Sequence, residues 1–148
     1  MTMELDDVDR RILEVLRRDG RASMNEVAVL VKISRASAYA RVKRMQDADV
    51  IQGFSVRTDP AREGLQASAY VALSVEQASW QDLRDRISKI PEVRHMALLG
   101  GEFDVLLLVR ARDNRDLRRV VLEELQAIPS VRSSRTFLVF EDIQPALT

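Results

Sequence analysis

A five-residue fragment occurs twice in the second half of the chain with one residue changed, and this repetition constrains the fold more than any other feature. Ile90-Pro91-Glu92-Val93-Arg94 returns as Ile128-Pro129-Ser130-Val131-Arg132, 38 residues later. Upstream of the two copies, Leu83 aligns with Leu117 at an offset of 34 residues. The difference of four residues is about one helical turn, so both copies share one plan and the second has the longer helix.

The repeated plan is strand, helix, strand, and it predicts an α+β fold. Apolar residues recur every three or four positions over 79–90 and 114–128, as they do in amphipathic helices. The remaining segments are rich in aliphatic residues and are predicted strands: 68–76, 93–99, 103–110 and 131–141. Two such units in tandem predict a ferredoxin-like βαββαβ domain, an antiparallel sheet with both helices on one face.

The predicted strands are apolar on both faces. Val105–Val109 and Phe137–Phe140 are apolar throughout, and Ala69–Leu73 comes close. A sheet covered by helices on one face should alternate apolar and polar residues. A second apolar face must be covered by something else, and the same face of another subunit is the most economical cover. The sequence therefore predicts a homodimer joined sheet to sheet.

The first fifty residues predict three helices. Apolar residues at spacings of three and four mark the first helix, which ends at Asp19-Gly20. Ser23 and Glu26 form a capping box that opens a short second helix. After a tight turn, Ser34 caps a third helix, whose inward-facing residues are Ala38, Val42 and Met45.

The segment 32–44 is basic although the whole chain is neutral. Twenty-three basic residues balance 23 acidic ones, yet this segment holds five cations and no acid. A local cluster of cations is typical of phosphate binding, although an ordinary solvated helix face has the same pattern. A short second helix and a tight turn before a basic third helix favour a helix-turn-helix over a plain three-helix bundle.

We therefore predict DNA binding by the third helix. Ser34, Arg35, Ser37 and Tyr39 are expected closest to the base edges in the major groove. The candidate phosphate-binding groups are Arg41, Lys43, Arg44 and the amides at the start of the second helix, capped by Ser23. Arg41 has the alternative role of a structural ion-pair partner.

Residues 50–56 alternate apolar and polar side chains, which predicts a short strand that ends at Asp59-Pro60 and makes the helix-turn-helix a winged type. Residues 58–66 contain Pro60 and Gly64 and are a predicted linker. The expected domains are 1–57 for DNA binding, and 67–148 for effector binding and oligomerisation.

The composition excludes several classes of function. The chain has no cysteine and a single histidine, which excludes zinc ribbons, iron–sulfur clusters, thiol nucleophiles and multi-histidine metal sites. No apolar stretch approaches the ~18 residues of a membrane span, and the acidic first residues do not resemble a signal peptide, so we expect a cytoplasmic protein. His95, Glu102 and Asp104 form no recognisable nucleophile–base pair, so we expect no enzyme and no cofactor.

The motifs together resemble the leucine-responsive/asparagine-responsive (Lrp/AsnC, feast/famine) regulator family. The resemblance rests on Leu5-Asp6-Asp7-Val8-Asp9, Asp19-Gly20-Arg21, Arg41-Val42-Lys43-Arg44-Met45, Val50-Ile51-Gln52-Gly53-Phe54 and Gly101-Glu102-Phe103-Asp104. It implies a transcription regulator that is dimeric, often assembles into tetramers or octamers, and binds a roughly palindromic operator. The family's C-terminal domain commonly senses amino acids between subunits, near a Gly-x-Tyr-Asp turn.

Three residues depart from the family pattern. Phe103 replaces the usual tyrosine, Gly100 stands where threonine or serine is common, and Asp49 replaces a glycine. The predicted effector site consists of Gly100, Gly101, Glu102, Phe103 and Asp104: glycine amides for a carboxylate, Asp104 or Glu102 for an ammonium, and Phe103 as an apolar wall. The space gained at Gly100 and the tyrosine hydroxyl missing at Phe103 favour an aromatic or branched amino acid as the effector. An architectural DNA-binding protein without an effector is the alternative.

Overall fold

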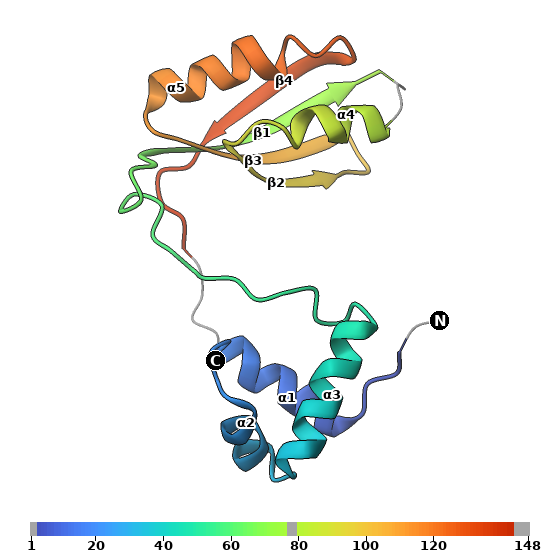
Figure 1. Ribbon diagram of the computed structural model, residues 1–148. Helices are drawn as coiled ribbons and strands as arrows, with labels where there is room; N and C mark the ends of the chain where they lie inside the picture. Colours follow the sequence, from blue (N-terminus) through green and yellow to red (C-terminus); the bar gives the residue numbers. More distant parts are fainter. Residues whose placement is uncertain (1–2, 77–79, 144–148) are drawn as a thin grey trace. The chain divides into compact units, whose positions relative to one another are not determined.

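The computed structural model describes residues 3–76 and 80–143, and Figure 1 shows its elements. The chain divides into two compact units. The first runs to Arg57, and the second extends from Thr58 to Ile143. None of the helices in the described ranges is long and apolar enough to cross a membrane.

The first unit contains the three expected helices: α1 (Asp7–Arg18), α2 (Met24–Val31) and α3 (Arg35–Asp47). Each begins at a side-chain cap, with Asp6, Ser23 and Ser34 accepting hydrogen bonds from backbone amides of the first turn. Lys32 ends α2 in the left-handed conformation, and Asp49 adopts φ 55° just after α3. Asp49 thus adopts the left-handed conformation that glycine favours and that aspartate tolerates better than most residues.

The strand predicted over 50–56 is wrong. The amides of Val50 and Ile51 donate to the carbonyl of Met45 at 2.9 and 3.0 Å, so this segment first completes the end of α3. Residues 52–58 then continue without regular structure, and Val56 is 80% exposed. A strand is stable only beside a neighbour, and no described segment pairs with this one. The alternation of apolar and polar side chains over 50–56 is therefore not sufficient to predict a strand.

The second unit is a four-stranded antiparallel sheet covered by helices. Its strands are β1 (Ala67–Val75), β2 (Val93–Leu98), β3 (Val105–Ala111) and β4 (Val131–Leu138), in the order β2-β3-β1-β4. Helix α4 (Trp80–Ile87) follows β1. Helix α5 (Asn114–Arg119) follows β3 and continues into the π-helical segment η1 (Val120–Leu125). The predicted ferredoxin-like plan is confirmed.

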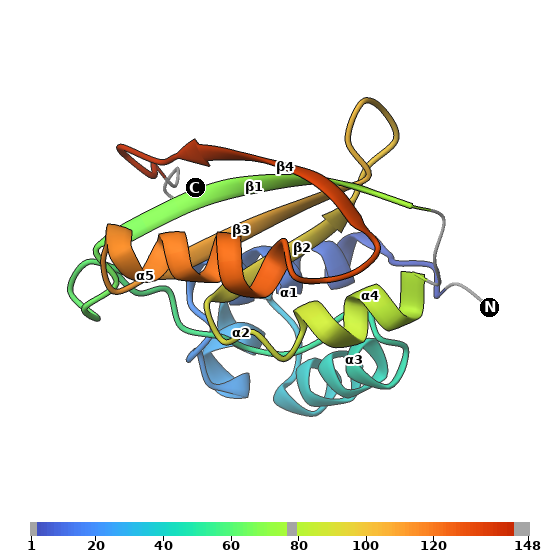
Figure 2. The same cartoon turned by 90° about the horizontal axis from the view of Figure 1, so that it is seen from above.

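Both helices pack on one face of the sheet (Figures 1 and 2). The residues of β1 and β3 that point to this face are buried with the apolar residues of α4, α5 and η1. Leu107 belongs to this core and is fully buried. The predicted helices 79–90 and 114–128 are shorter in the structure, and Ser79 lies outside the described residues.

The face of the sheet opposite the helices is the second apolar face that the sequence of the strands predicts. Cross-strand register places His95, Leu108, Tyr70 and Phe137 in one row across β2, β3, β1 and β4. Tyr70 is 40% exposed and Phe137 49% exposed. We call this surface the outer face of the sheet. Within the second unit, no described helix covers it, because α4 and α5 both pack on the other side.

Residues 58–66, predicted as a linker, form a hydrogen-bonded turn within the second unit. Leu65 and Glu63 donate backbone hydrogen bonds to the carbonyl of Pro60 at 2.9 and 3.1 Å. The amide of Gln66 donates to the carbonyl of Arg112 at 3.2 Å, which ties the segment to the end of β3.

Candidate functional site

Helix α3 presents a polar stripe away from the core of the first unit. Arg35, Tyr39 and Lys43 recur every four residues and therefore share one helix face. All three are exposed, and Tyr39 is 62% exposed. Lys43 lies 3.1 Å from Asp47 within the same helix, whereas Arg35 has no acidic partner among the described residues. Arg35 is the freest cation of the predicted DNA-binding set.

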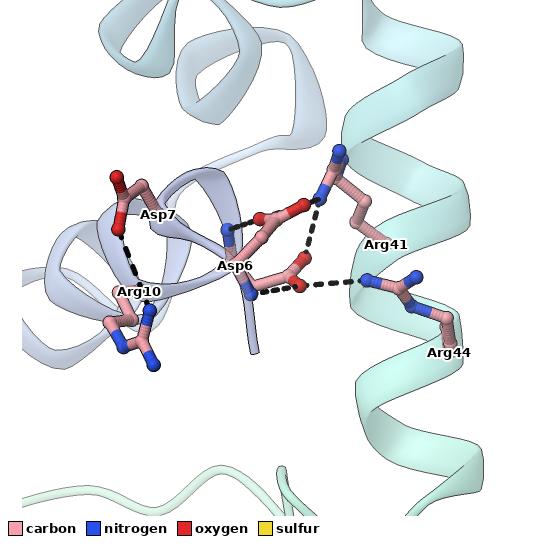
Figure 3. A network of polar contacts seen from close by, with 6 residues as sticks. Asp6, Asp7, Arg10, Arg41 and Arg44 are labelled. Carbon is pink, nitrogen blue, oxygen red and sulfur yellow. Dashed lines mark hydrogen bonds and ion pairs between the residues drawn. The ribbon is translucent and has the colours of Figure 1, made fainter. Parts of the chain in front are cut away.

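The other two arginines of α3 point to α1 instead. The guanidinium of Arg41 donates from Nη1 to Asp9 Oδ1 at 2.8 Å and to Asp6 Oδ2 at 2.7 Å, as Figure 3 shows for Asp6. Arg44 Nη2 donates to Asp9 Oδ2 at 2.7 Å. The side chain of Asp9 is fully buried. Asp6, Asp9, Arg41 and Arg44 thus form a clasp between α1 and α3.

This clasp has clear electrostatic consequences. The hydrogen bond from Arg41, helped by the amide of Asp9, lowers the pKa of Asp6 to about 2. Hydrogen bonds to the carboxylates of Asp6 and Asp9 raise the pKa of Arg41 above its ordinary value. A buried carboxylate is tolerated only when its partners replace its lost hydration, so the two arginines are needed where they are.

Ser23 and Ser34 have local structural roles. Ser23 Oγ accepts from the amide of Glu26 at 3.2 Å, and Glu26 Oε2 accepts from the amide of Ser23 at 2.7 Å. These bonds lower the pKa of Glu26. Ser34 Oγ accepts from the amide of Ser37 at 3.0 Å, and its hydroxyl proton stays available to another acceptor.

The loop between β2 and β3 holds the residues of the predicted effector site. The amides of Gly100, Gly101, Glu102 and Phe103 donate no hydrogen bond within the described residues. Gly101 has φ +156°, a backbone conformation that residues with a side chain rarely adopt. No atom lies within 4 Å of the position that a Cβ would take there. The loop therefore presents a run of unoccupied donors.

Asp104 has a structural role in the sheet beside the predicted role in effector binding. Its Oδ2 accepts from the amide of Val75 at 2.8 Å, and its own amide donates to the carbonyl of Leu73 at 2.9 Å. Its carbonyl accepts from the amide of Leu99 at 2.9 Å. The side chain thus stabilises the irregularity of β1 between Ser74 and Val75. The other carboxylate of the loop belongs to Glu102, whose side chain is 76% exposed.

Arg135 is a member of this cluster that sequence reasoning missed. Its guanidinium carbon lies 5.2 Å from the centre of the Phe103 ring, and Nη1 lies 4.0 Å from Glu102 Oε1. Arg135 is 32 residues from Phe103 in sequence, so the pairing of β4 with β1 was needed to bring them together. The available signal was the alternation along β4, which places Arg135 and Phe137 on one face.

The side chains considered for catalysis belong to β2 and to the β2–β3 loop of the second unit. His95 lies in β2, opposite Leu108 in the register, and Asp104 is engaged with β1. No group of three or more histidine, aspartate or glutamate side chains in residues 3–76 and 80–143 is arranged to hold a metal ion.

Both units match known protein families. Residues 5–46 match the AsnC-type helix-turn-helix domain, and residues 68–146, more than half of the chain, match the Lrp/AsnC ligand binding domain. The chain belongs to the Lrp/AsnC family. It is thus a DNA-binding transcriptional regulator with a ligand-binding domain, and the resemblance inferred from the sequence is confirmed.

Relatives and solved structures agree with this assignment. The chain is 38% identical over 146 residues to the HTH-type transcriptional regulator AldR of Mycolicibacterium smegmatis, covering 97% of this chain and 85% of the relative. It is 32% identical to the proline dehydrogenase transcriptional activator of Rhizobium radiobacter, covering 97% and 94%. A Neisseria meningitidis regulator solved as a complex with L-methionine superposes with a TM-score of 0.88 at 27% identity, covering 96% and 94%.

Proposed function

We propose that this Lrp/AsnC regulator binds a free amino acid at the β2–β3 loop and that the bound ligand changes its binding to DNA. The observation that carries the proposal is the run of unoccupied amides from Gly100 to Phe103 beside the exposed carboxylate of Glu102. An amino acid carries a carboxylate and an ammonium on one carbon, which matches donors and an acid side by side. The L-methionine complex of the Neisseria regulator supports the same class of ligand.

For DNA binding, we propose that different residues of α3 contact bases, contact a phosphate or hold the helix in place. Ser34, Arg35, Ser37 and Tyr39 face the bases, and Lys43 contacts a phosphate. Arg41 and Arg44 act mainly by holding α3 against α1, because both already pair with a buried acid. Ser23 contributes through the capped start of α2, whose first amides remain candidates for a phosphate.

We further propose that two subunits join through the outer face of the sheet. Half-exposed Tyr70 and Phe137 lie in one row with the partly buried Leu108, and a second copy of the row would remove them from water. Such a dimer requires a roughly palindromic operator with half-sites one helical turn or a multiple apart, ~10 bp. Tetramers and octamers would be built from it. The protein would act in the cytoplasm by binding alone, without an enzymatic step.

A screen of the twenty amino acids against the melting temperature of the intact protein tests the effector. A ligand that binds only the native state at 100 times its Kd stabilises it by about 2.7 kcal/mol, which moves the melting temperature by several degrees. A DNA fragment selected from a random library then reports whether the same amino acid changes the Kd for DNA. If no amino acid moves either quantity, the architectural alternative holds.

A further inference from the structure

We infer that Arg135 is the carboxylate receptor of the effector site and so sets its preference for α-amino acids over other amines. The inference deepens the proposed function and rests on it. Among the described residues, Arg135 is the cation placed against the β2–β3 loop, in contact with both Phe103 and Glu102.

The sheet fixes where Arg135 lies. In the register of β4 against β1, Arg135 is the partner of Ala72, whose small side chain leaves the arginine room to extend across the sheet. In the next strand, Ala72 pairs with Leu106 of β3, close to where that strand emerges from the loop. The guanidinium of Arg135 thus lies over the Phe103 ring and is carried by a strand. A strand positions a side chain more precisely than a loop does.

The present contacts of Arg135 leave its hydrogen-bonding capacity open. Its distance to Glu102 is 4.0 Å, which is longer than a hydrogen bond, and its side chain is 60% exposed. A guanidinium stacked on an aromatic ring keeps its N–H groups in the plane, directed outward. A carboxylate can then accept two parallel hydrogen bonds from Arg135, the geometry for which this side chain is suited.

A comparison with the other cations of the same region supports this assignment. Arg132, also on β4, lies 3.2 Å from Glu76, and Arg110 donates to Asp142 at 2.7 Å. Both have acidic partners within hydrogen-bond distance. Arg135 has its acid beyond that distance, and it contacts the side chains of Glu102 and Phe103, two residues whose amides are unoccupied. It therefore combines with those amides into one anion-binding group.

The acid of the loop then takes the opposite end of the ligand. Asp104 is already bound to the amide of Val75, so the ligand's ammonium falls to Glu102, which has the weak contact with Arg135. A bound amino acid would insert its two charges between Glu102 and Arg135. The ligand thus replaces a long, exposed ion pair with two close ones, and neither charge of the cluster is left alone.

The position of Arg135 also connects the ligand to assembly. Arg135 shares a strand face with Phe137, so it belongs to the outer face proposed as the subunit interface. A ligand held by Arg135 would lie at the margin of that interface. Arg135 as a pure subunit contact is the competing role, and the experiment below separates the two.

The test is calorimetry of the intact protein with L-methionine, L-leucine and L-phenylalanine and with the carboxamide of each. The parent should prefer the amino acid that it binds best over the matching amide by about tenfold or more, because the amide lacks the charged end. Arg135→Gln should lose that preference and bind the amino acid about tenfold more weakly, and Arg135→Lys should restore part of both. Arg132→Gln, a change of the same chemistry on the same strand, should behave as the parent.

The outcomes are distinct. Parent-like affinity and selectivity in Arg135→Gln would overturn the role of Arg135 while leaving the effector site in place. A parent that binds none of the three amino acids overturns the role as well, and if the twenty-amino-acid screen is also negative the effector proposal fails with it. Light scattering of each variant completes the test: loss of the dimer in Arg135→Gln with selectivity unchanged assigns the residue to the interface instead.

Discussion

Both units of this regulator have an apolar core, and only the first adds a buried charged cluster to it. In the first unit, Ala38, Val42 and Met45 pack α3 into the core. Buried Asp9 adds a charged contact, because it holds Arg41 and Arg44 of α3. In the second, α4 and α5 lie on the sheet through an apolar core, and the β2–β3 loop is held by the backbone bonds of Asp104. A charged clasp depends on every partner, whereas an apolar core tolerates changes that conserve its volume and is strongly destabilised by a buried unpaired charge.

The largest effect is expected from a charge placed in the core of the second unit. Leu107→Asp puts a carboxylate among fully buried side chains of the helix face. An unpaired buried charge should cost more than about 4 kcal/mol, enough to unfold the unit. Trp80 is the only tryptophan of the chain and packs against this core, so its fluorescence in urea reports the loss directly.

The neighbouring residue supplies the matched control. Leu108 points to the outer face, so Leu108→Asp should leave the Trp80 transition near that of the parent and shift the protein from dimer to monomer. Light scattering at micromolar concentration measures the change. A parent that is monomeric under these conditions, or a Leu108→Asp variant that remains dimeric, would refute the sheet-to-sheet interface.

The second prediction tests the clasp of the first unit. Asp9→Asn removes the charge that both arginines share, and the loss of hydrogen bonds to a charged group should cost about 1.5–3 kcal/mol. Because the change lies in the first unit, the helical signal in circular dichroism should melt earlier while the Trp80 fluorescence transition stays in place. Coincident shifts of both signals would show that the two units unfold as one.

The third prediction compares two arginines of α3 on DNA. Arg35→Ala should weaken binding to a selected operator by ~1–3 kcal/mol and relax the preference at one base pair, with stability unchanged. Arg44→Ala should lower stability and weaken binding to all sequences alike, because α3 loses a contact that orients it. Titrations against operator and unrelated DNA at two salt concentrations measure both effects. Relaxed sequence preference in Arg44→Ala would place that residue at a base instead.

The same contrast between charge and apolar packing explains what the sequence could reveal. Apolar periodicity predicted the helices and the two-sided strands, because burial has a regular spacing along each element. The pairs of Arg41 and Arg44 with Asp9 join residues more than thirty positions apart, and only the packing of α3 on α1 brings them together. Counting local charge therefore favoured phosphate contacts for both arginines, with a structural ion pair as the alternative for Arg41. It could not place Arg135 beside Phe103. The strand expected at 50–56 failed for a similar reason, since pairing depends on a partner elsewhere in the chain.

The smallest predicted effect is an acid-dependent loss of stability in the first unit. The pKa of Asp6 is lowered from 3.8 to about 2 by the hydrogen bond from Arg41. A carboxyl with a lower pKa in the folded chain binds fewer protons there than in the unfolded chain, so its stabilising contribution is complete above about pH 4. It declines as the pH falls through the folded value near 2. Asp6 is half-exposed, so the contribution should be modest and should shrink with added salt.

Urea unfolding followed by circular dichroism at pH 5, 3 and 2 measures this contribution to the free energy of unfolding. Asp6→Asn should unfold with a shallower dependence on pH over this range, whereas Asp7→Asn, which removes a nearby acid whose ion pair with Arg10 is highly exposed, should keep the parent's dependence. Equal pH dependence in Asp6→Asn and the parent would mean that the clasp holds α3 through Asp9 alone.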